Sequence, residues 1–187
     1  MCTAKCSRCI AVTLFPLAAI SIICSIVLFF PGGDIKYAKE GHITEEVKYM
    51  GGLIGGGIMV LISALYIQCT GEEGCCGNRC GMFFSIIFAG VAVFGALLSM
   101  ALAVLALRNG PLCKYEGQWT TPFNNSDLDY LNNPELWEKC TEPERIVQFN
   151  TGLFITLIAT NSLQAFLCNI QMINGFFGCL CGTCIKK

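Results

Sequence analysis

The chain has 187 residues, of which 54% are hydrophobic and only 13% are charged, and its formal net charge is -1. A soluble globular domain carries about 25% charged residues, so this composition excludes an ordinary water-soluble protein. The charge balance, with no basic stripe in the sequence, also argues against nucleic-acid binding.

Four stretches of the sequence contain no Asp, Glu, Lys, Arg or His. They run from Ile10 to Phe30, Tyr49 to Gln68, Met82 to Leu107 and Leu153 to Phe177. A helix needs about 20 apolar residues to cross a hydrocarbon core of roughly 30 Å, and each stretch is long enough. The sequence predicts an all-α membrane protein, an antiparallel bundle of four transmembrane helices that forms one domain over residues 1–187.

The first stretch could be mistaken for a secretory signal, because Lys5 and Arg8 precede it. It is longer than the apolar region of a typical signal peptide, which has about 7–15 residues. Phe29-Phe30-Pro31 also offers no small-residue cleavage site. We expect this stretch to be retained as a membrane span.

An even number of spans places both termini on one side, with connections at residues 31–48, 69–81 and 108–152. The distribution of Lys and Arg indicates the orientation only weakly. The long connection adds better signals: Asn124 opens the glycosylation sequon Asn124-Asn125-Ser126, and Cys113 and Cys140 suit an oxidising compartment. We predict cytoplasmic termini, a large extracellular loop at 108–152, and a glycan on Asn124, with an unoccupied sequon as the alternative.

A disulfide between Cys113 and Cys140 would close a loop of about 28 residues and contribute roughly 3–4 kcal/mol by chain entropy. Asn133-Pro134-Glu135 inside the loop is typical of a helix start. These signals predict a compact, disulfide-tied cap, and the alternative is a floppy connection with two free thiols. Trp119 and Trp137 serve either as recognition residues or as the core of the loop.

Cysteines are concentrated next to the spans on the predicted inner side, where thiols stay reduced. The members are Cys2, Cys6, Cys9, Cys75, Cys76, Cys80, Cys179, Cys181 and Cys184. We predict palmitoylation of at least some of them, because juxtamembrane cysteines are the usual substrates. Zinc bound by Cys-x-x-Cys pairs is the alternative, disfavoured because the pairs lie on separate short tails. Cys24, Cys69 and Cys168 are expected to be packing residues.

Small residues predict where the helices approach one another, since lipid offers apolar helices no hydrophobic reason to associate. The second span contains Gly51, Gly52, Gly55, Gly56 and Gly57, and the third contains Ala92, Gly95, Ala96, Ser99 and Ala103. In the fourth span, Asn161, Gln164 and Gln171 fall on one helical face, which we expect to point into the bundle. A substrate pathway along that face is the alternative, but no ionisable residue accompanies the amides.

Several motifs, spread from end to end, resemble the transmembrane-four L-six family, relatives of the tetraspanins. They are Met1-Cys2-Thr3-Ala4-Lys5-Cys6-Ser7-Arg8-Cys9, Phe29-Phe30-Pro31-Gly32-Gly33, the glycines at 51–57, Cys75-Cys76-Gly77, Asn109-Gly110-Pro111-Leu112-Cys113, Tyr130-Leu131-Asn132, Leu136-Trp137-Glu138-Lys139-Cys140-Thr141-Glu142-Pro143 and Asn174-Gly175. Tetraspanins proper carry Cys-Cys-Gly in the large outer loop, whereas here Cys75-Cys76-Gly77 falls in the inner one. The chain departs from the family at Ser25, where relatives often have Asn, and at Gly152, which removes a sequon at Asn150.

The resemblance implies a non-enzymatic membrane organiser in the plasma and endosomal membranes, with no cofactor or metal. Its implied lateral partners are integrins, growth-factor receptors, other tetraspanin-like proteins and further copies of itself, and through them it would affect adhesion, migration and proliferation. A transporter or channel is one rival, and a thiol oxidoreductase is another, although its reactive Cys-x-x-Cys belongs near the outer end of a span. A claudin-like barrier protein is disfavoured because the first outer loop is short. His42 is the only histidine and lies in a short loop, which favours no catalytic site.

Overall fold

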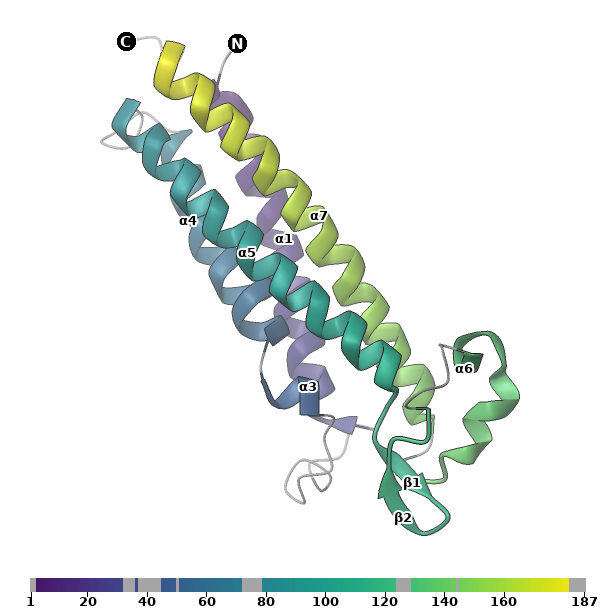
Figure 1. The fold of residues 1–187 in the computed structure, drawn as a ribbon. Coiled ribbons are helices and arrows are strands. Elements are labelled where there is room, and N and C mark those ends of the chain that lie inside the picture. Colours follow the sequence, from purple (N-terminus) through teal and green to yellow (C-terminus); the bar gives the residue numbers. More distant parts are fainter. Residues whose placement is uncertain are drawn as a thin grey trace.

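The computed structural model describes residues 3–31, 36, 45–49, 51–71, 79–123, 129–143 and 145–181 of the chain. Within this part, four long helical segments form an elongated antiparallel bundle (Figure 1). They are α1 (Thr3–Leu28), η2 with α4 (Gly52–Met59 and Val60–Thr70), α5 (Arg79–Asn109) and α7 (Ile146–Cys181). Each is long and apolar enough to cross a bilayer, so the predicted four-span fold is confirmed.

The helices extend beyond the uncharged stretches that revealed them. Helix α1 already begins at Thr3, so Lys5 and Arg8 are helical, and α7 begins at Ile146, well ahead of Leu153. An uncharged stretch marks the residues that can lie in hydrocarbon. A helix can extend further, because it continues until its backbone hydrogen bonds are interrupted. Pro16 lies inside α1.

The second span starts as a wide π-helix, η2, before it continues as α4. π-Helical segments are rare and are usually limited to a single turn, so eight residues in this form are unusual. Gly55, Gly56 and Gly57 lie inside the segment and are all buried. Because glycine has no side chain, this wide backbone fits between the neighbouring helices.

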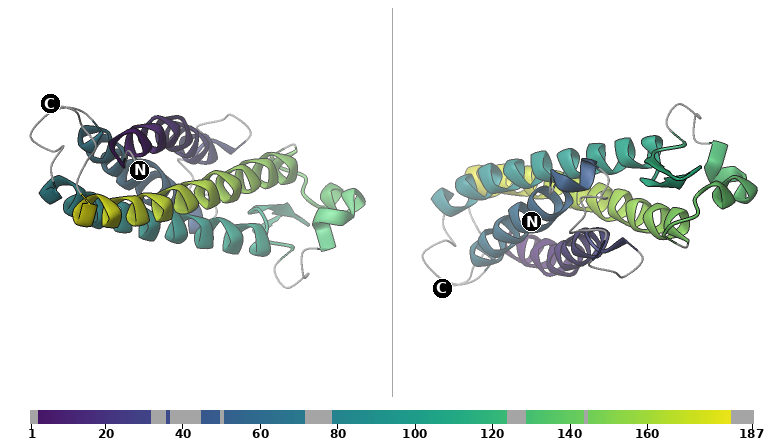
Figure 2. Two further views of the ribbon diagram at one scale, coloured as in Figure 1. Left: turned by 90° about the horizontal axis from the view of Figure 1, so that it is seen from above. Right: turned by 90° about the horizontal axis from the view of Figure 1, so that it is seen from below.

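Helices α5 and α7 run side by side along the bundle, and α1 packs against α7 and α4 (Figure 2). Small residues of α5 face the interior: Ala92, Gly95, Ala96, Ser99 and Ala103 are all buried. Ala92 and Ala96 share an apolar cluster with Leu14 of α1 and Val60 of α4, and Ala103 belongs to a second cluster. Many large apolar side chains of α5, such as Phe83, Phe94 and Leu98, instead point outward, where a soluble protein would place polar ones.

The end of the bundle opposite the chain termini carries a small cap between α5 and α7 (Figure 1). The cap contains a hairpin of β1 (Cys113–Tyr115) and β2 (Gln118–Thr120), followed by α6 (Asp129–Asn132) and the 3-10 helix η3 (Pro134–Lys139). Glu116 and Gly117 form the turn with φ of 50° and 84°, as a two-residue type I′ hairpin requires. A further short helix, α3 (Glu45–Lys48), precedes η2.

Candidate functional site

Polar side chains of α7 form a hydrogen-bonded layer in the half of the bundle nearer the cap. Asn161 Nδ2 donates to Ser99 Oγ of α5 over 2.8 Å. Gln164 Nε2 donates to the carbonyl oxygen of Gly56 in η2 over 2.9 Å and to Ser21 Oγ of α1 over 3.3 Å. Both amides are fully buried. Their hydrogen bonds connect α7 to α1, η2 and α5.

A second polar layer lies near the ends of α1, α5 and α7 that face away from the cap. Gln171 Nε2 donates to Ser7 Oγ over 3.1 Å and to Ser85 Oγ over 3.3 Å. Asn174 Nδ2 donates to Ser7 Oγ over 2.9 Å and to the carbonyl oxygen of Thr3 over 3.0 Å. Amides in lipid need partners, and these find them on the neighbouring helices.

Between the two layers, α7 contributes Cys168, which is buried in an apolar cluster with Leu14 and Val60. The polar face of α7 is therefore interrupted by an apolar layer. Among the described residues, the amides bond to neighbouring helices and do not line a continuous polar path. This arrangement disfavours the substrate pathway as an interpretation of Asn161, Gln164 and Gln171.

The predicted glycine contacts lie where η2 meets its neighbours. A Cβ on Gly95 would lie 2.7 Å from the carbonyl oxygen of Gly55, so the two backbones touch directly. A Cβ on Gly56 would collide with the Asn161 amide, and one on Gly57 would meet Ile22. Gly51 and Gly52 likewise face Leu102 and Ser25. A side chain at Gly55 would collide with backbone, whereas one at any of the other four glycines would collide first with a side chain of a neighbouring helix.

The cap is built around the disulfide between Cys113 and Cys140, whose Cα atoms are 5.5 Å apart. Its apolar cluster contains Cys113, Phe123, Tyr130, Ile146 and Val147, with Leu136 and Trp137 packed against it. The indole of Trp137 donates to the carbonyl oxygen of Tyr130 over 2.6 Å. Because Ile146 and Val147 belong to α7, the core of the cap is continuous with the bundle.

Tyr130 attaches the cap to the end of α5. Its hydroxyl donates to the carbonyl oxygen of Leu107, and its ring stacks on Phe123 with centroids 4.7 Å apart. Burial raises the pKa of the Tyr130 hydroxyl, so the group stays a neutral donor. The bonded carbonyl belongs to the last turn of a helix, where such groups lack intrahelical partners.

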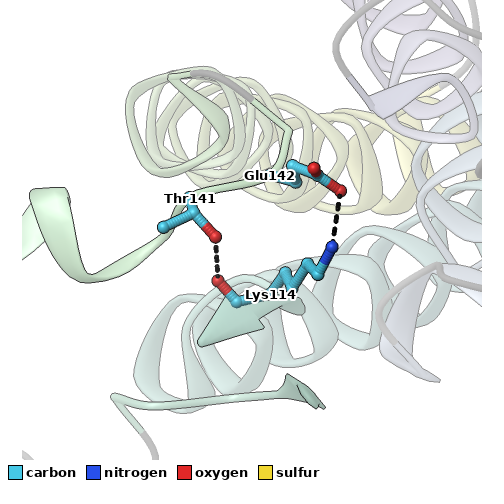
Figure 3. Close-up of polar contacts among 3 residues, drawn as sticks. All are labelled: Lys114, Thr141 and Glu142. Atoms are coloured by element: carbon cyan, nitrogen blue, oxygen red, sulfur yellow. Dashed lines mark hydrogen bonds and ion pairs between the residues drawn. The ribbon is translucent and has the colours of Figure 1, made fainter. Parts of the chain in front are cut away.

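A further connection joins the hairpin to the segment before α7 (Figure 3). Lys114 Nζ lies 3.4 Å from Glu142 Oε2, and Thr141 Oγ1 donates to the carbonyl oxygen of Lys114 over 2.9 Å. The backbones of Lys114 and Glu142 form an isolated antiparallel bridge. The ion pair is solvent-exposed and contributes little by itself, but the backbone bonds beside it fix the position of the segment.

An open cavity of about 440 Å³ lies between η3 and the start of α7. Its lining includes Trp137, Arg145, Ile146 and Val147. Arg145 is exposed and adopts a φ of 57°, which is uncommon for a residue with a side chain. The lining contains a tryptophan and an arginine, two residue types that are enriched at interface hot spots, together with the acidic Glu138.

The described cysteines divide into exposed and buried groups. Cys9, Cys69 and Cys80 are exposed, while Cys6 and Cys179 are half-buried. Cys24 and Cys168 are buried, as expected for packing residues. The same expectation is wrong for Cys69, which lies on the outward face at the end of α4. The thiol of Cys179 contacts the carbonyl oxygen of Arg79, so the ends of α5 and α7 adjoin there.

Comparison with known proteins identifies the family. A model of the L6 membrane protein family matches residues 1–185. The chain belongs to the L6 membrane protein family. It is similar to human Transmembrane 4 L6 family member 5, with 38% identity covering 100% of this chain and 98% of the relative. It is also similar to human member 1, at 39% identity and coverage of 98% and 96%, and to rat member 4, at 42% and coverage of 98% and 94%. No solved structure matches the chain.

Several polar residues that bond in the interior of this L6 protein were not predicted from the sequence. Ser7, Ser21, Ser85 and Asn174 complete the two layers around the predicted amides. Serine gives no distinctive signal in a span, because its hydroxyl can bond to its own helix, as Ser85 also does to Met82. Asn174 could have been found, since it continues the amide face three residues after Gln171.

Some predicted positions of the L6 chain lie outside the described residues. These are Asn124, Cys2, Cys75, Cys76 and Cys184, while Cys181 ends α7 with its side chain undescribed. Within the described residues, no group of three His, Cys, Asp or Glu side chains could hold a metal ion. The palmitoylation of the inner cysteines and the glycan at Asn124 stay predictions.

Proposed function

We propose that this L6 protein is a non-enzymatic membrane organiser that associates laterally with integrins, growth-factor receptors and tetraspanin-like relatives. Through these partners it would affect cell adhesion, migration and proliferation. The observation that carries the proposal is the continuity between cap and bundle, because Tyr130 attaches the cap to α5 while Ile146 and Val147 extend its core into α7. A contact made by a cap that is attached to two spans in this way would hold the spans of a partner beside those of this protein.

The proposed topology places the cap outside the cell and both termini in the cytoplasm, in the plasma and endosomal membranes. In this orientation the disulfide lies in the oxidising compartment and the exposed thiols Cys9 and Cys80 lie at the reducing face. Asn124, in the same outer connection, would carry the glycan. The chain would act as one membrane domain over its whole length.

Palmitoylation of the inner cysteines would add a second means of lateral association, beside the contacts of the cap. Cys9 and Cys80 are accessible, and Cys6 and Cys179 are partly so. Each buried methylene of an acyl chain adds about 0.8 kcal/mol of membrane affinity. Acyl chains around the inner end of the bundle would select its lipid surroundings and thereby its neighbours.

Crosslinking in intact cells, followed by quantitative isolation of integrins and growth-factor receptors, tests the proposal. A variant with all nine inner cysteines changed to serine is compared with a matched variant that changes the buried Cys24 and Cys168 to serine. The first should reach the cell surface but lose lateral partners, and the second should keep them. Equal recovery of receptors with both variants would contradict the acyl-dependent mechanism.

A further inference from the structure

One amide side chain of α7 faces lipid within its span. The uncharged stretch at 153–177 contains five Asn and Gln residues, and the four described above bond to other helices. The fifth, Asn169, is exposed on the outer surface of α7. It lies four residues from the midpoint of the stretch, which is about 6 Å along the helix axis. Its amide therefore lies in hydrocarbon, where no water is available as a partner.

The hydrogen-bonding capacity of Asn169 is only partly used. Its Nδ2 donates one hydrogen to the carbonyl oxygen of Ala165, in the preceding turn, over 2.8 Å. The second hydrogen of Nδ2 and the two lone pairs of Oδ1 have no partner in the part of the chain that the structure describes. Thr156 and Ser162, which are also exposed, differ because each can donate its single hydrogen to a carbonyl group of its own helix. A contact that completed the bonds of the Asn169 amide would be favoured in lipid.

The residues around Asn169 form an exposed strip with the spacing of a coiled-coil contact, which we call the α7 seam. The seam contains Ile155, Ser162, Asn169 and Phe176, which recur every seven residues, with Phe166 and Ile173 between them. All six are exposed, and the side chains of Phe166 and Ile173 are 64% and 59% exposed. A seven-residue repeat keeps one strip of a helix against a partner helix when the two cross at about 20°. The seam can therefore lie along a second helix over its whole length.

We propose that the α7 seam pairs with the α7 seam of a second copy of this chain, with the two Asn169 amides bonded to each other. Copies that share one orientation in the membrane have parallel α7 helices. A two-fold axis along the membrane normal then brings each seam residue to the depth of its counterpart. Each Nδ2 donates its second hydrogen to Oδ1 of the other amide and keeps its bond to Ala165. Because an amide is complementary to itself, one contact completes both side chains.

Two other occupants of the seam match the amide less well. An acyl chain has neither a donor nor an acceptor, so it leaves Oδ1 without a partner. A span of a different protein must carry a polar residue at the same depth, whereas a second copy always supplies one. The pairing goes beyond the receptor partners proposed above and does not depend on them. It can be tested with this chain as the only protein in the bilayer.

A photocrosslinking residue in the seam identifies what covers it. The full-length variant Phe166→p-benzoylphenylalanine is expressed in cells, where its copies share one orientation, and is irradiated in isolated membranes. Mass spectrometry should find this position linked to α7 of a second copy. The same replacement at Leu65 is the control, because Leu65 is 53% exposed on α4, which packs against α1 and α5. Adducts at position 166 with lipid alone or with another protein alone, or equal yields of linked copies from both positions, would overturn the proposal.

Asn169→Leu tests the amide pair itself. The change is made on the lipid-facing surface and keeps the buried contacts of α7, so the bundle should stay folded. Self-association is measured in phosphatidylcholine vesicles by energy transfer between copies that carry donor and acceptor fluorophores, as the lipid-to-protein ratio is raised. Asn169→Leu should weaken the dimer at least fivefold, because two interhelical hydrogen bonds are lost. Asn169→Gln keeps an amide and should retain most of the association.

Thr13→Val is the matched control for the loss of a lipid-facing polar group. Thr13 is exposed on α1, and its hydroxyl donates to the carbonyl oxygen of Cys9 in its own helix, so it has no need of a partner from another copy. This variant should associate as the unchanged protein does. Equal association of Asn169→Leu and the unchanged protein, or an equal loss with Thr13→Val, would show that the amides do not pair.

Discussion

Gly55 and Gly95 meet directly across the contact of η2 with α5, each with its α-carbon against the carbonyl group of the other. A Cβ on Gly95 would lie 2.7 Å from the Gly55 carbonyl oxygen and 3.2 Å from the Met59 sulfur. The nearest atoms on each side belong to the backbone, which cannot move aside as a flexible side chain would. This close approach of η2 and α5 therefore depends on the absence of a side chain at both glycines.

Gly95→Ala should destabilise the bundle by about 1–3 kcal/mol, because the added methyl forces the two backbones apart. Gly90→Ala is the matched control on the same helix, since a Cβ there meets nothing within 4 Å. The control should be neutral or stabilising by up to about 1 kcal/mol, because alanine favours helix. The free energy of unfolding of each variant is measured in bicelles. A similar loss of stability in the two variants would show that the contact is not tight.

Asn161 and Ser99 should show energetic coupling across the α5–α7 contact. Their hydrogen bond spans 2.8 Å between buried groups, and such bonds within membranes contribute about 0.6 kcal/mol on average and about 1.7 kcal/mol at most. A double-mutant cycle with Asn161→Ala and Ser99→Ala measures the coupling directly. Additive effects of the two changes would mean that the bond contributes nothing to stability.

Reduction of the Cys113–Cys140 disulfide should loosen the cap and leave the bundle intact. Chain-entropy estimates for a loop of this length are roughly 3–4 kcal/mol, while the spans have separate apolar clusters. Limited proteolysis after mild reduction should cut between α5 and α7 first, and Cys113→Ser with Cys140→Ser should behave alike without reductant. Helical content, followed by circular dichroism, should change little, and its collapse would contradict this separation of cap and bundle.

The stability of the cap should decrease in alkaline solution because of Tyr130. Burial raises the pKa of its hydroxyl above the ordinary value of 10.0, so folding favours the neutral form. The stabilisation is complete below that ordinary pKa and is lost as the pH rises through the higher folded-state pKa. Tyr130→Phe should lack this pH-dependent loss and cost about 1 kcal/mol at neutral pH through the missing hydrogen bond.

Ultraviolet titration of tyrosinate formation measures the effect and needs a control for Tyr115. The pKa of that exposed hydroxyl is also raised, chiefly by the negative charge of Glu116 and further by a hydrogen bond to it. Tyr115→Phe should remove one alkaline transition without loosening the cap. If Tyr130→Phe and Tyr115→Phe had the same effect on cap stability, the buried hydroxyl would have no special role.

The four spans could be predicted from the sequence because uncharged stretches as long as a membrane is thick are rare outside membrane proteins. The amide face of α7 was equally visible, since the side chains recur with helical spacing. The ends of the helices were not, because α1 extends from Ile10 back to Thr3 through charged residues that lie beyond the hydrocarbon. The charge of a side chain indicates whether it lies in water or in hydrocarbon. The end of a helix depends instead on backbone hydrogen bonding.

The π-helix and the hairpin were not predicted. A run of glycines reveals close packing, but it contains no information on whether the backbone bonds to the fourth or the fifth residue. The hairpin turn uses Glu116 where Asn or Asp is usual, so its sequence signal is weak. The outward position of Cys69 depends on how α4 is rotated against its neighbours, which only the assembled bundle determines.

The amides of α7 bond to groups on α1, η2 and α5, and α7 is synthesised after all three of these segments. Until it arrives, the three earlier spans lack the donors that bridge them, and α7 itself enters the bilayer with polar groups that lipid cannot satisfy. Completion of the bundle therefore waits for the synthesis of α7. A nascent chain stopped before Asn161 would be recognisable to cellular quality control as incomplete.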